Sequence, residues 1–452
     1  MPHHPDAIES CAIDSTAIAA STEPSSMCEL LTERKTGTES GPLQGKRAGI
    51  VVLSAYPFDP RPRRSADVLV RQGMSVDYIC IADGKAPWRE ETNGINVFRV
   101  PIDHQRGGKL GYAYQYSAFI LASAAILAAR SRRHRYDLIF VNNMPDILVV
   151  SALLPKLFGA KVILDLHDPM PELMMTIFGK DPVSKSVRLL KFLEKWSAAR
   201  ADRVLVPNVA CRRLLASRSC PEDRIAVMMN SPDESIFTFS SARLRSSLSN
   251  KPVVVMYHGT LVERNGLDIA IEAFARLRNQ LPTAQLHIYG RATPFLERVM
   301  QLAREHDLQK NVLHFGQKPL EQIVSAIDAC DVGLIPNRHN AFTHINTPTR
   351  IFEYLARGKP VIAPRTAGIQ DYFNEASLLF FEPGNAEELA RQIEFVSSHP
   401  REALTVTERG QQVYLAHTWK QERQTLVRLV EKLFKREEKR NGCGSISSSA
   451  PF

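Results

Sequence analysis

Residues 347–364, TPTRIFEYLARGKPVIAP, combine charged side chains with the signals of a helix start. Thr347 is a predicted N-cap, and Pro348 fits the first helical position. Arg350 and Glu353 then lie on one face of the opening turns, where a cation opposes the helix dipole but can hold an anion. We predict that Arg350 and the helix amide groups bind phosphate and that Glu353 accepts hydrogen bonds from sugar hydroxyl groups. A surface ion pair between these two residues is the alternative.

A strand, a glycine turn and a helix start are predicted within residues 257–274, YHGTLVERNGLDIAIEAF. Gly259 allows the backbone to come close to a ligand, and Arg264 supplies a mobile positive charge. This arrangement favours a second phosphate contact. The alternative is that Arg264 is a solvated loop residue.

A histidine lies at the predicted carboxyl end of a strand in the segment LDLHDPMPE, residues 164–172. His167 has acidic neighbours on both sides, Asp165 and Asp168, and a proline-restricted loop follows. Ligands bind at this end of the strands in open α/β sheets. We therefore predict a functional role for His167, with a purely structural one as the alternative.

The composition is that of a globular chain with a positive field. The 452 residues are 44% hydrophobic and 23% charged, and their net charge of +9 favours anionic partners. The seven cysteines form no C-x-x-C pair, which argues against a zinc ribbon or disulfide scaffold and favours a reducing compartment. No secretory signal is expected, because residues 1–46 contain no apolar run.

Several common site motifs are absent from the sequence. It has no G-x-G-x-x-G after a strand, no G-x-x-x-x-G-K-[ST] and no G-x-S-x-G elbow. It also lacks D-x-D, the usual carboxylate pair for a metal-bound nucleotide-sugar, and we predict no metal site. The basic residues are not interleaved with aromatic ones as in nucleic-acid modules, so we expect no nucleic-acid partner.

Short apolar runs alternate with helix-length patterns, which is typical of parallel sheets covered by helices on both faces. In the first half, strands are predicted at 49–56, 75–82, 95–101, 137–143, 160–168 and 203–208. After a polar stretch, a second series follows at 252–259, 285–290, 312–316, 332–336, 360–364 and 377–381. We predict an α/β fold of two doubly wound domains facing a central cleft.

These patterns divide the chain into five segments. Residues 47–240 form the first domain and residues 241–410 the second, and a terminal helix over 411–438 could cross back to the first. Residues 1–46 and 439–452 are predicted to be disordered tails, because they lack a sustained apolar period.

Residues 110–129, LGYAYQYSAFILASAAILAA, carry no charge and are long enough to span a bilayer. Gln115 and three tyrosines weaken that interpretation, and a span would split the alternating domain. We expect a helix pressed against the sheet. A membrane-surface contact and a true span stay open as alternatives, and the basic cluster at 130–135 could face anionic lipid.

Taken together, these segments resemble the retaining nucleotide-sugar glycosyltransferases of the GT-B fold, family four. YHGTLVERNGLD resembles the family's phosphate-binding loop, LHIYGR its nucleotide-side glycine turn, and NVLHFGQKP its base-binding edge. CDVGLIP followed by NTPTRIFEYLARGKPVIA is similar to the donor-site signature, and TAGIQDYF to the loop that meets the donor sugar. In the looser first half, YPFDPRPRRSADVLVRQGMSVD resembles the opening acceptor-domain loop and helix. NNMPD with DLHDPMPE resembles a variant in exopolysaccharide-type members.

The resemblance covers about residues 48–435 and implies two Rossmann-like domains, with acceptor on the first and donor on the second. It also implies retention of the anomeric configuration, no metal and no cofactor besides the nucleotide diphosphate sugar as co-substrate. The implied site residues are Arg264 and Arg350 at the diphosphate, Gly259 and Thr260 in the phosphate loop, Glu353 at the ribose, Gly290 and Gln317 at the base, Gly368 and Ile369 at the sugar, His167 across the cleft, and Asp168 and Arg61 on the acceptor side.

Two positions depart from the family pattern. The acid that the family often places eight residues before its ribose-binding acid is Ile345 here, with the neighbouring His344 and Asn346 as available substitutes. The usual Arg and Lys of the phosphate loop fall on Thr260 and Asn265, so the neighbouring arginine must supply that charge.

We predict metal-independent, retaining transfer of a hexose from a UDP- or GDP-sugar to a hydroxyl of a glycan or lipid-linked saccharide. Without a metal, the two arginines and helix-end amides must stabilise the leaving diphosphate. We expect a cytoplasmic protein, with peripheral contact with the inner face of an anionic membrane as an option. The alternatives are a nucleotide-sugar epimerase of the same fold and a non-catalytic protein that binds sugar-nucleotides.

Overall fold

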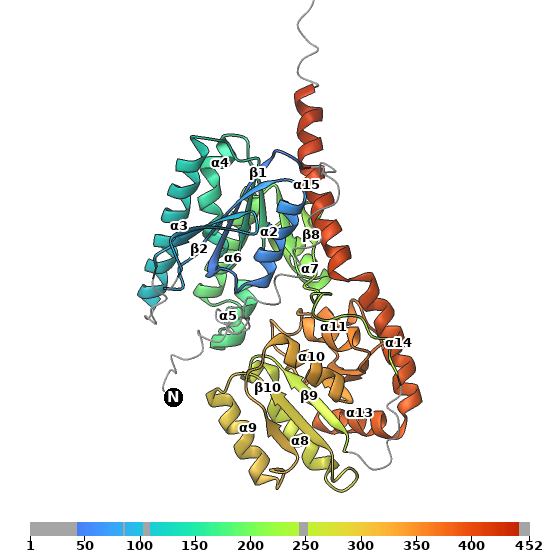
Figure 1. Cartoon of the computed structure of the whole chain (residues 1–452). Helices are drawn as coiled ribbons and strands as arrows, with labels where there is room; N and C mark the ends of the chain where they lie inside the picture. Colours follow the sequence, from blue (N-terminus) through green and yellow to red (C-terminus); the bar gives the residue numbers. More distant parts are fainter. Residues whose placement is uncertain (1–42, 85, 103–108, 244–251, 443–452) are drawn as a thin grey trace, which may run out of the picture.

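A computed structural model describes residues 43–84, 86–102, 109–243 and 252–442, which form two α/β domains (Figure 1). Each domain is built on one sheet with helices on both faces. The predicted fold class of two facing doubly wound domains is therefore confirmed. Most of the two predicted tails lies outside the described residues.

The first sheet has eight strands in the order β3-β4-β2-β1-β5-β6-β7-β8, and only β3 runs antiparallel to its neighbour. The strands are β1 (Arg47–Ala55), β2 (Ser75–Ile81), β3 (Arg89–Thr92), β4 (Ile95–Val100), β5 (Leu138–Asn142), β6 (Lys161–Asp165), β7 (Arg203–Val206) and β8 (Ile225–Val227). The central strands are buried on both faces and were therefore recognisable as apolar runs. The sequence prediction missed β3, a polar edge strand, and the three-residue β8.

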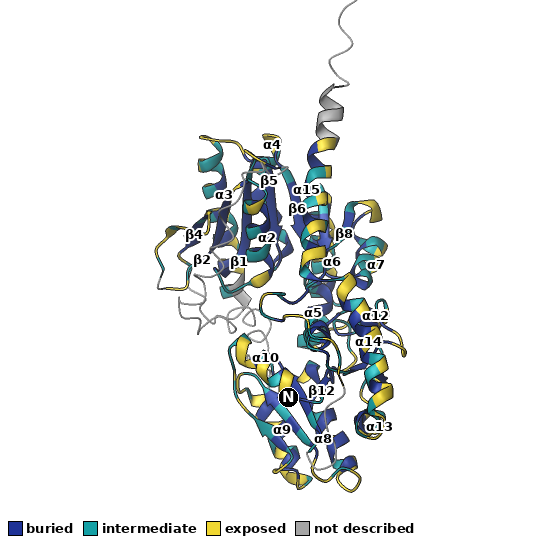
Figure 2. Ribbon diagram, turned by 45° about the vertical axis from the view of Figure 1, so that its right-hand side comes forward, coloured by how far each residue is buried: buried dark blue, intermediate teal, exposed yellow. Residues whose placement is uncertain are grey.

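Two layers of helices cover the first sheet. One face carries α3 (Lys109–Ser131), η3 (Asp146–Ala152), α6 (Lys185–Arg200) and α7 (Val209–Arg218), whose apolar residues join one core cluster. The short α4 (Leu153–Leu157) lies beside α3 and η3 on the same face. The other carries α2 (Pro60–Arg71) and α15 (Trp419–Gly442). The short α5 (Met170–Phe178) and η4 (Glu222–Arg224) complete the domain. The strands are buried between these layers (Figure 2).

The second sheet has six parallel strands in the order β11-β10-β9-β12-β13-β14. They are β9 (Val254–His258), β10 (Gln285–Tyr289), β11 (Val312–His314), β12 (Val332–Leu334), β13 (Val361–Pro364) and β14 (Leu379–Phe381). One face carries α8 (Leu267–Leu277), α9 (Pro294–Glu305) and α13 (Ala386–Ser398), and the other α10 (Leu320–Ala329), α11 (Thr349–Ala356) and α14 (Pro400–Ala416). Two short helices, η5 (Glu263–Asn265) and α12 (Ala367–Gln370), follow β9 and β13.

The end of the chain forms two helices where the sequence predicts one over 411–438. α14 packs on the second domain, whereas α15 returns to the first, where Leu426 and Val430 are fully buried. The two crossings between the domains are bonded to each other: Met229 N donates to Glu422 Oε2 (2.9 Å), and Lys420 N donates to Glu234 Oε2 (2.8 Å).

The described residues extend slightly into both predicted tails. Leu43 is buried in the core of the first domain, because it packs with α2 and α15, and α15 continues to Gly442. Among the described residues, no helix is both long and apolar enough to cross a membrane. Helix α3, which contains the uncharged residues 110–129, lies against the first sheet, with Phe119 and Leu127 in the core.

A close approach between α11 and β12 fixes the place of α11 in the second domain. Tyr354 of α11 is fully buried, and its hydroxyl donates to the carbonyl of Met256 (2.9 Å). A Cβ atom on Gly333 of β12 would lie 2.3 Å from the Tyr354 ring. Glycine at position 333 therefore lets α11 settle directly on the sheet.

We expect Gly333→Ala to lower the free energy of unfolding by about 1–3 kcal/mol, because the added methyl group overlaps the Tyr354 ring. Gly111→Ala is the matched control: no atom lies within 4 Å of its Cβ position in α3, so this change should be neutral or stabilising. Thermal and denaturant unfolding of both variants measures the difference. Equal stability of the two variants would contradict this account of α11.

Candidate active site

The carboxyl ends of strands from both sheets meet where the domains touch. Helix α5, which follows β6, and the N-cap residue of α7, which follows β7, both contact the loop after β12. Thr176 Oγ1 of α5 donates to Asn340 Oδ1 (2.9 Å), and Asn208 Nδ2 donates to the carbonyl of Ile345 (2.8 Å). The strand ends at which open α/β sheets bind ligands are thus brought together.

Arg350 is held at the end of β9 by contacts with that strand. Its Nη1 donates to the carbonyl of His258 (2.7 Å), and its guanidinium lies 4.6 Å from the centre of the Tyr257 ring. A Cβ on Gly259 would lie 3.0 Å from this nitrogen, so glycine leaves room for the guanidinium. Arg350 is also the second residue of α11. Its charge therefore lies at a helix amino end beside a glycine turn, a placement suited to an anion.

The predicted N-cap of this helix is wrong. Pro348 occupies the capping position in extended conformation, and α11 begins at Thr349. The hydroxyl of Thr347 donates instead to the carbonyl of Gly368 (2.6 Å). The Thr347 hydroxyl thus bonds to a carbonyl that is distant in the sequence, and not to a backbone group at the start of α11 as the local pattern predicted.

Three glycine turns follow β9, β10 and β11 and are bonded to one another. Gly259 N donates to the carbonyl of Tyr289 (3.0 Å), and Gly290 N donates to the carbonyl of Gly316 (3.0 Å). A Cβ on Gly290 would lie 2.2 Å from the carbonyl oxygen of Gly259. Glycine therefore permits the close stacking of these turns at the carboxyl edge of the sheet.

Glu353 lies one turn after Arg350 and against His258. Glu353 Oε2 and His258 Nε2 are 3.2 Å apart, and the two side chains are only 15% and 10% exposed. Burial raises the pKa of Glu353 to about 7, although the positive charges of Arg350 and of Arg64 on α2 oppose the increase. Burial and the Arg350 charge lower the pKa of His258 to about 3. At neutral pH the histidine is thus uncharged, and the carboxyl group is near its midpoint.

Buried polar atoms without a hydrogen-bond partner recur at these strand ends. Within the described parts of the chain they include His258 Nε2, whose contact with the carboxylate is not aligned as a hydrogen bond. The others here are Thr260 Oγ1, Asn337 Oδ1 and Thr366 Oγ1 in the second domain and His167 Nδ1 in the first. Since buried polar atoms are normally paired, a polar ligand at these strand ends would satisfy them.

Asn143, directly after β5, shapes the loop that carries His167 and Asp168. Its Oδ1 accepts from the backbone N–H groups of His167 (3.2 Å) and Asp168 (3.4 Å). Its Nδ2 donates to the carbonyl of Asp168 (2.6 Å) and to Asp146 Oδ1 (3.0 Å). The sequence reasoning did not single out this buried residue. The available signal was a pair of asparagines at the end of a predicted strand.

Arg61 is held in a buried ion pair, and its predicted contact with the acceptor stays a prediction. Arg61 is 5% exposed, and its Nε and Nη2 donate to the two carboxylate oxygens of Asp165 (2.7 and 2.8 Å). Its Nη1 donates to the carbonyl of Met228 (2.9 Å) and to Asn230 Oδ1 (2.8 Å). Arg61 thus ties α2 to β6 and to the segment after β8, and Asp165 is its partner rather than an acid of the His167 site.

Ile345 takes part in the contact between the domains. Its side chain packs against the core of the first domain. A Cβ on Gly368 would lie 2.4 Å from the carbonyl oxygen of Ile345, and Gly368 N donates to the carbonyl of His344 (2.9 Å). The apolar residue at position 345 therefore serves domain packing. The Ile369 side chain is buried in the core of the second domain, which leaves only its backbone to approach a sugar.

Two further predicted site residues, Arg264 and Gln317, follow β9 and β11. Arg264 is a half-buried residue of η5, and its carbonyl accepts from Arg338 N (3.0 Å). Gln317 is exposed beyond β11, and its Oε1 accepts from Arg291 Nε (3.4 Å). Their contacts with phosphate and base stay predictions. Nowhere in the described ranges are three His, Cys, Asp or Glu side chains grouped so as to hold a metal ion.

Two family models match the chain, one in each domain. The "Glycosyl transferase 4-like domain" matches residues 60–231, and "Glycosyl transferases group 1" matches residues 240–413. The two matches together cover more than half of the chain. The chain belongs to the GT-B glycosyltransferases of family four.

Relatives of this GT-B chain include WcaL of Salmonella typhimurium, a glycosyltransferase assigned to colanic acid biosynthesis. It is 27% identical over 196 residues, which are 43% of this chain and 47% of WcaL. The sulfoquinovosyl transferase SQD2 of Arabidopsis thaliana is 23% identical over 310 residues, 65% of this chain and 56% of SQD2. The GT-B chain thus spans about half the length of the curated relatives it matches.

Solved structures share the fold of this GT-B chain. Sucrose-phosphate synthase from Thermosynechococcus elongatus has a TM-score of 0.70 and 20% identity, over 86% of this chain and 100% of that one. Anabaena HepE in complex with UDP-glucose has a TM-score of 0.62 and 16% identity, over 85% and 99%.

We expect Glu353→Gln to stabilise the GT-B chain relative to wild type, and increasingly so as pH rises. The raised pKa of Glu353 means that the folded state binds this proton more tightly than the unfolded state. The wild-type protein therefore loses stability as the pH rises from the ordinary pKa of a glutamate toward 7. The difference in unfolding free energy should grow by about 1–3 kcal/mol between about pH 5 and about pH 8.

Thermal unfolding of the ligand-free protein across this pH range measures that difference. Glu408→Gln is the control, because Glu408 is exposed on α14. A pH-independent difference between Glu353→Gln and wild type would show that Glu353 is not buried as described.

Proposed function

We propose that this GT-B chain transfers a hexose from a UDP- or GDP-linked sugar to a hydroxyl group of a glycan or lipid-linked saccharide. The transfer retains the anomeric configuration and needs no metal ion. The observation that carries the proposal is the Arg350 guanidinium, fixed by the His258 carbonyl and the Tyr257 ring at the amino end of α11 beside the Gly259 turn.

In the proposed reaction, the bond between the anomeric carbon and the diphosphate oxygen breaks, and a bond from the acceptor hydroxyl oxygen forms on the same face. The hydroxyl proton passes to the departing diphosphate. The negative charge that develops on the diphosphate falls beside Arg350 and the amide groups of α11. Because these groups are held in place before the donor arrives, little reorganisation is needed during the reaction.

The second domain would bind the nucleotide, and the first would supply the acceptor side. Glu353 accepts hydrogen bonds from the ribose when ionised, and the glycine turns after β9 and β10 lie along the diphosphate and base. His167 and Asp168 approach the sugar from the first domain on the loop that Asn143 holds. The UDP-glucose bound to HepE and the glycosyltransferase names of the relatives support a nucleotide-sugar donor.

Arg350→Ala should weaken UDP or GDP binding by about 1.5–3 kcal/mol, which is roughly ten- to a hundredfold in Kd, because a charged hydrogen bond to phosphate is lost. Isothermal titration calorimetry with each diphosphate measures this change. Arg391→Ala, which removes an exposed arginine from α13, is the matched control. Unchanged diphosphate affinity in a folded Arg350→Ala protein would remove the central support of the proposal.

Asn143→Ala should lower kcat and leave the Kd of the nucleoside diphosphate near the wild-type value. The substitution frees the His167–Asp168 loop but touches no group of the second domain. Loss of several buried hydrogen bonds that orient this loop should cost about tenfold or more in kcat. A parallel change in diphosphate affinity would assign Asn143 to the overall fold instead.

Incubation of donor with and without acceptor distinguishes the proposed transferase from its two alternatives. A transferase releases nucleoside diphosphate and forms a glycoside only when an acceptor hydroxyl is present. An epimerase converts the donor without acceptor and releases no diphosphate, whereas a non-catalytic binding protein leaves the donor unchanged. Adding EDTA in the same assay tests metal independence.

A further inference from the structure

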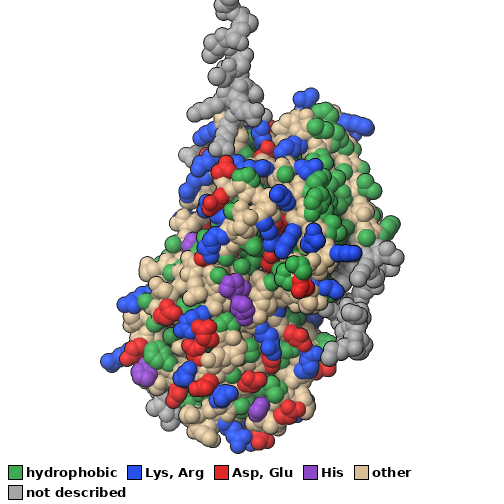
Figure 3. Space-filling view, turned by 180° about the vertical axis from the view of Figure 1, so that it is seen from behind, with side chains coloured by type: hydrophobic (Ala, Val, Ile, Leu, Met, Phe, Trp, Pro, Cys, Tyr) green, Lys and Arg blue, Asp and Glu red, His purple; other side chains and the backbone are tan. Residues whose placement is uncertain are grey.

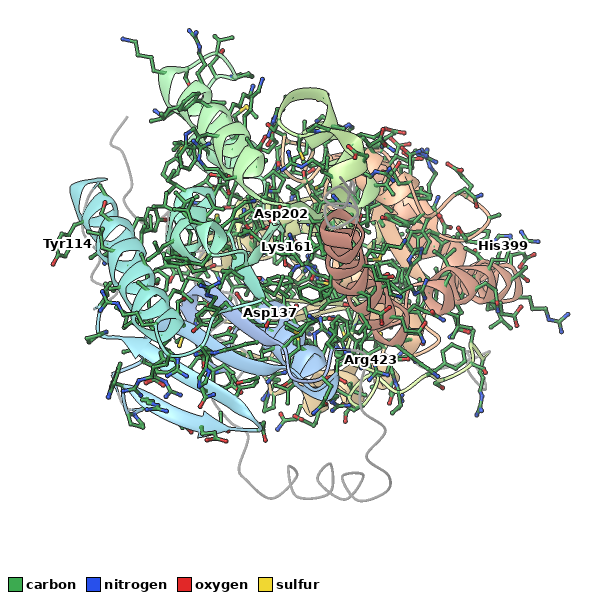
Figure 4. All side chains as sticks on the ribbon, turned by 90° about the horizontal axis from the view of Figure 1, so that it is seen from above. Tyr114, Asp137, Lys161, Asp202, His399 and Arg423 are labelled. Carbon is green, nitrogen blue, oxygen red and sulfur yellow. The ribbon has the colours of Figure 1, made fainter. Side chains whose placement is uncertain are left out.

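The outward side of α3 carries no charge for most of its length. The exposed residues between Gly111 and Arg130 are Ala113, Tyr114, Ser117, Leu121, Ala125 and Ala129, which recur at the period of a helix. Tyr114 is 73% and Leu121 70% exposed. Figure 4 shows Tyr114 directed away from the rest of the domain. A helix that faces water normally carries charged residues on its outer side, so this stripe is unusual.

The neighbouring helices extend this apolar surface. α4 lies beside α3, and α6 lies beside η3 on the same face of the sheet. Eight of the twelve large apolar side chains exposed among the described residues lie on these helices or at their ends. They are Tyr114, Leu121, Leu154, Leu157, Phe158, Val183, Leu189 and Phe192. We call this surface the α3–α6 face.

Positive charge predominates on the α3–α6 face, although the exposed Asp181 lies just before α6. Its helices α3, η3, α4 and α6 contain only two acidic residues, Asp146 and Glu194, and both are buried. Exposed basic residues lie on α6 and just after α3, namely Lys185, Arg188, Lys195, Arg132 and Arg133. The view from behind shows apolar side chains gathered on one side of the first domain with Lys and Arg around them (Figure 3).

We propose that the α3–α6 face docks on the surface of a lipid bilayer that carries anionic headgroups. Exposed apolar side chains enter the interfacial region of such a surface, and the surrounding basic residues gain from its negative potential. The charge pattern favours lipid over a protein partner. A protein surface with charges of both signs would leave some of the basic residues of this face unpaired, whereas a continuous anionic lipid surface offers each of them a negative charge. This inference is independent of the proposed transfer reaction.

Flotation of the full chain with vesicles tests the proposal, using phosphatidylcholine alone and phosphatidylcholine mixed with phosphatidylglycerol. Wild type should bind the mixed vesicles at about 0.1 M salt and much less at about 1 M, where screening is short-ranged. Arg188→Gln with Lys195→Gln should weaken this binding by about twentyfold, since each basic residue near the surface contributes about fivefold. Leu121→Ser with Leu157→Ser should weaken it by about tenfold or more.

Matched controls carry the same kinds of change on the second domain. Arg391→Gln with Arg401→Gln removes two exposed arginines of α13 and α14, and Leu415→Ser removes an exposed leucine of α14. Both controls should bind vesicles as wild type does. All variants should keep the wild-type melting temperature, because the altered side chains are exposed.

Two results would overturn the membrane assignment. The first is equal vesicle binding by wild type and by both α3–α6 variants. The second is a concentration-dependent dimer in sedimentation velocity that the leucine variants abolish, because this would assign the face to a second copy of the chain. Binding of nucleoside diphosphate, measured on the same proteins, should not change in any variant and keeps this test separate from that of the transfer reaction.

Discussion

The guanidinium of Arg350 at the start of α11 is held in place by the end of β9, and the proposed anion site depends on this contact. Its hydrogen bond to the His258 carbonyl and its place over the Tyr257 ring require the end of β9 and the first turn of α11 to lie within a few ångströms. Gly259 makes that approach sterically allowed, and Gly333 lets α11 reach the sheet. The packing of the second domain is thus what positions its charge.

Burial has opposite effects on the two ionisable groups beside this arginine. It favours the neutral form of each, which raises the pKa of the Glu353 carboxyl group and lowers that of the His258 imidazole. The first domain contributes through Arg64, whose charge reaches Glu353 from α2. The protonation of Glu353 therefore depends on charges from both domains.

Much of the fold was predictable because parallel strands buried on both faces are continuous apolar runs. The polar edge strand β3 and the three-residue β8 lack that signal, so they were missed. The sequence also located Arg350 at a helix start, because that feature is local, whereas the contact of Arg350 with the end of β9 joins segments about ninety residues apart. The Thr347 hydroxyl bonds to the carbonyl of Gly368, and a local sequence pattern cannot predict a partner so distant in the chain.

Residue pairs far apart in the chain set the limits of the sequence interpretation. Arg61 and Asp165 are separated by more than a hundred positions, and nothing in either segment indicates that the two charges neutralise each other. Asn143 likewise acts on a loop more than twenty residues away. At Ile345 the departure from the family pattern was visible in the sequence, but the packing of its side chain against the core of the first domain, which accounts for it, was not.

The return of α15 to the first domain restricts how the molecule can flex. Both passages of the chain between the domains lie side by side and share the bonds from Met229 to Glu422 and from Lys420 to Glu234. Two connecting segments bonded to each other in this way resist rotation and translation of one domain relative to the other. Bending of the two domains about these segments is then the least costly movement. Such bending would separate Thr176 from Asn340, whereas the two connecting segments would keep their contacts with each other. The space between the two domains would then widen on the side away from these segments.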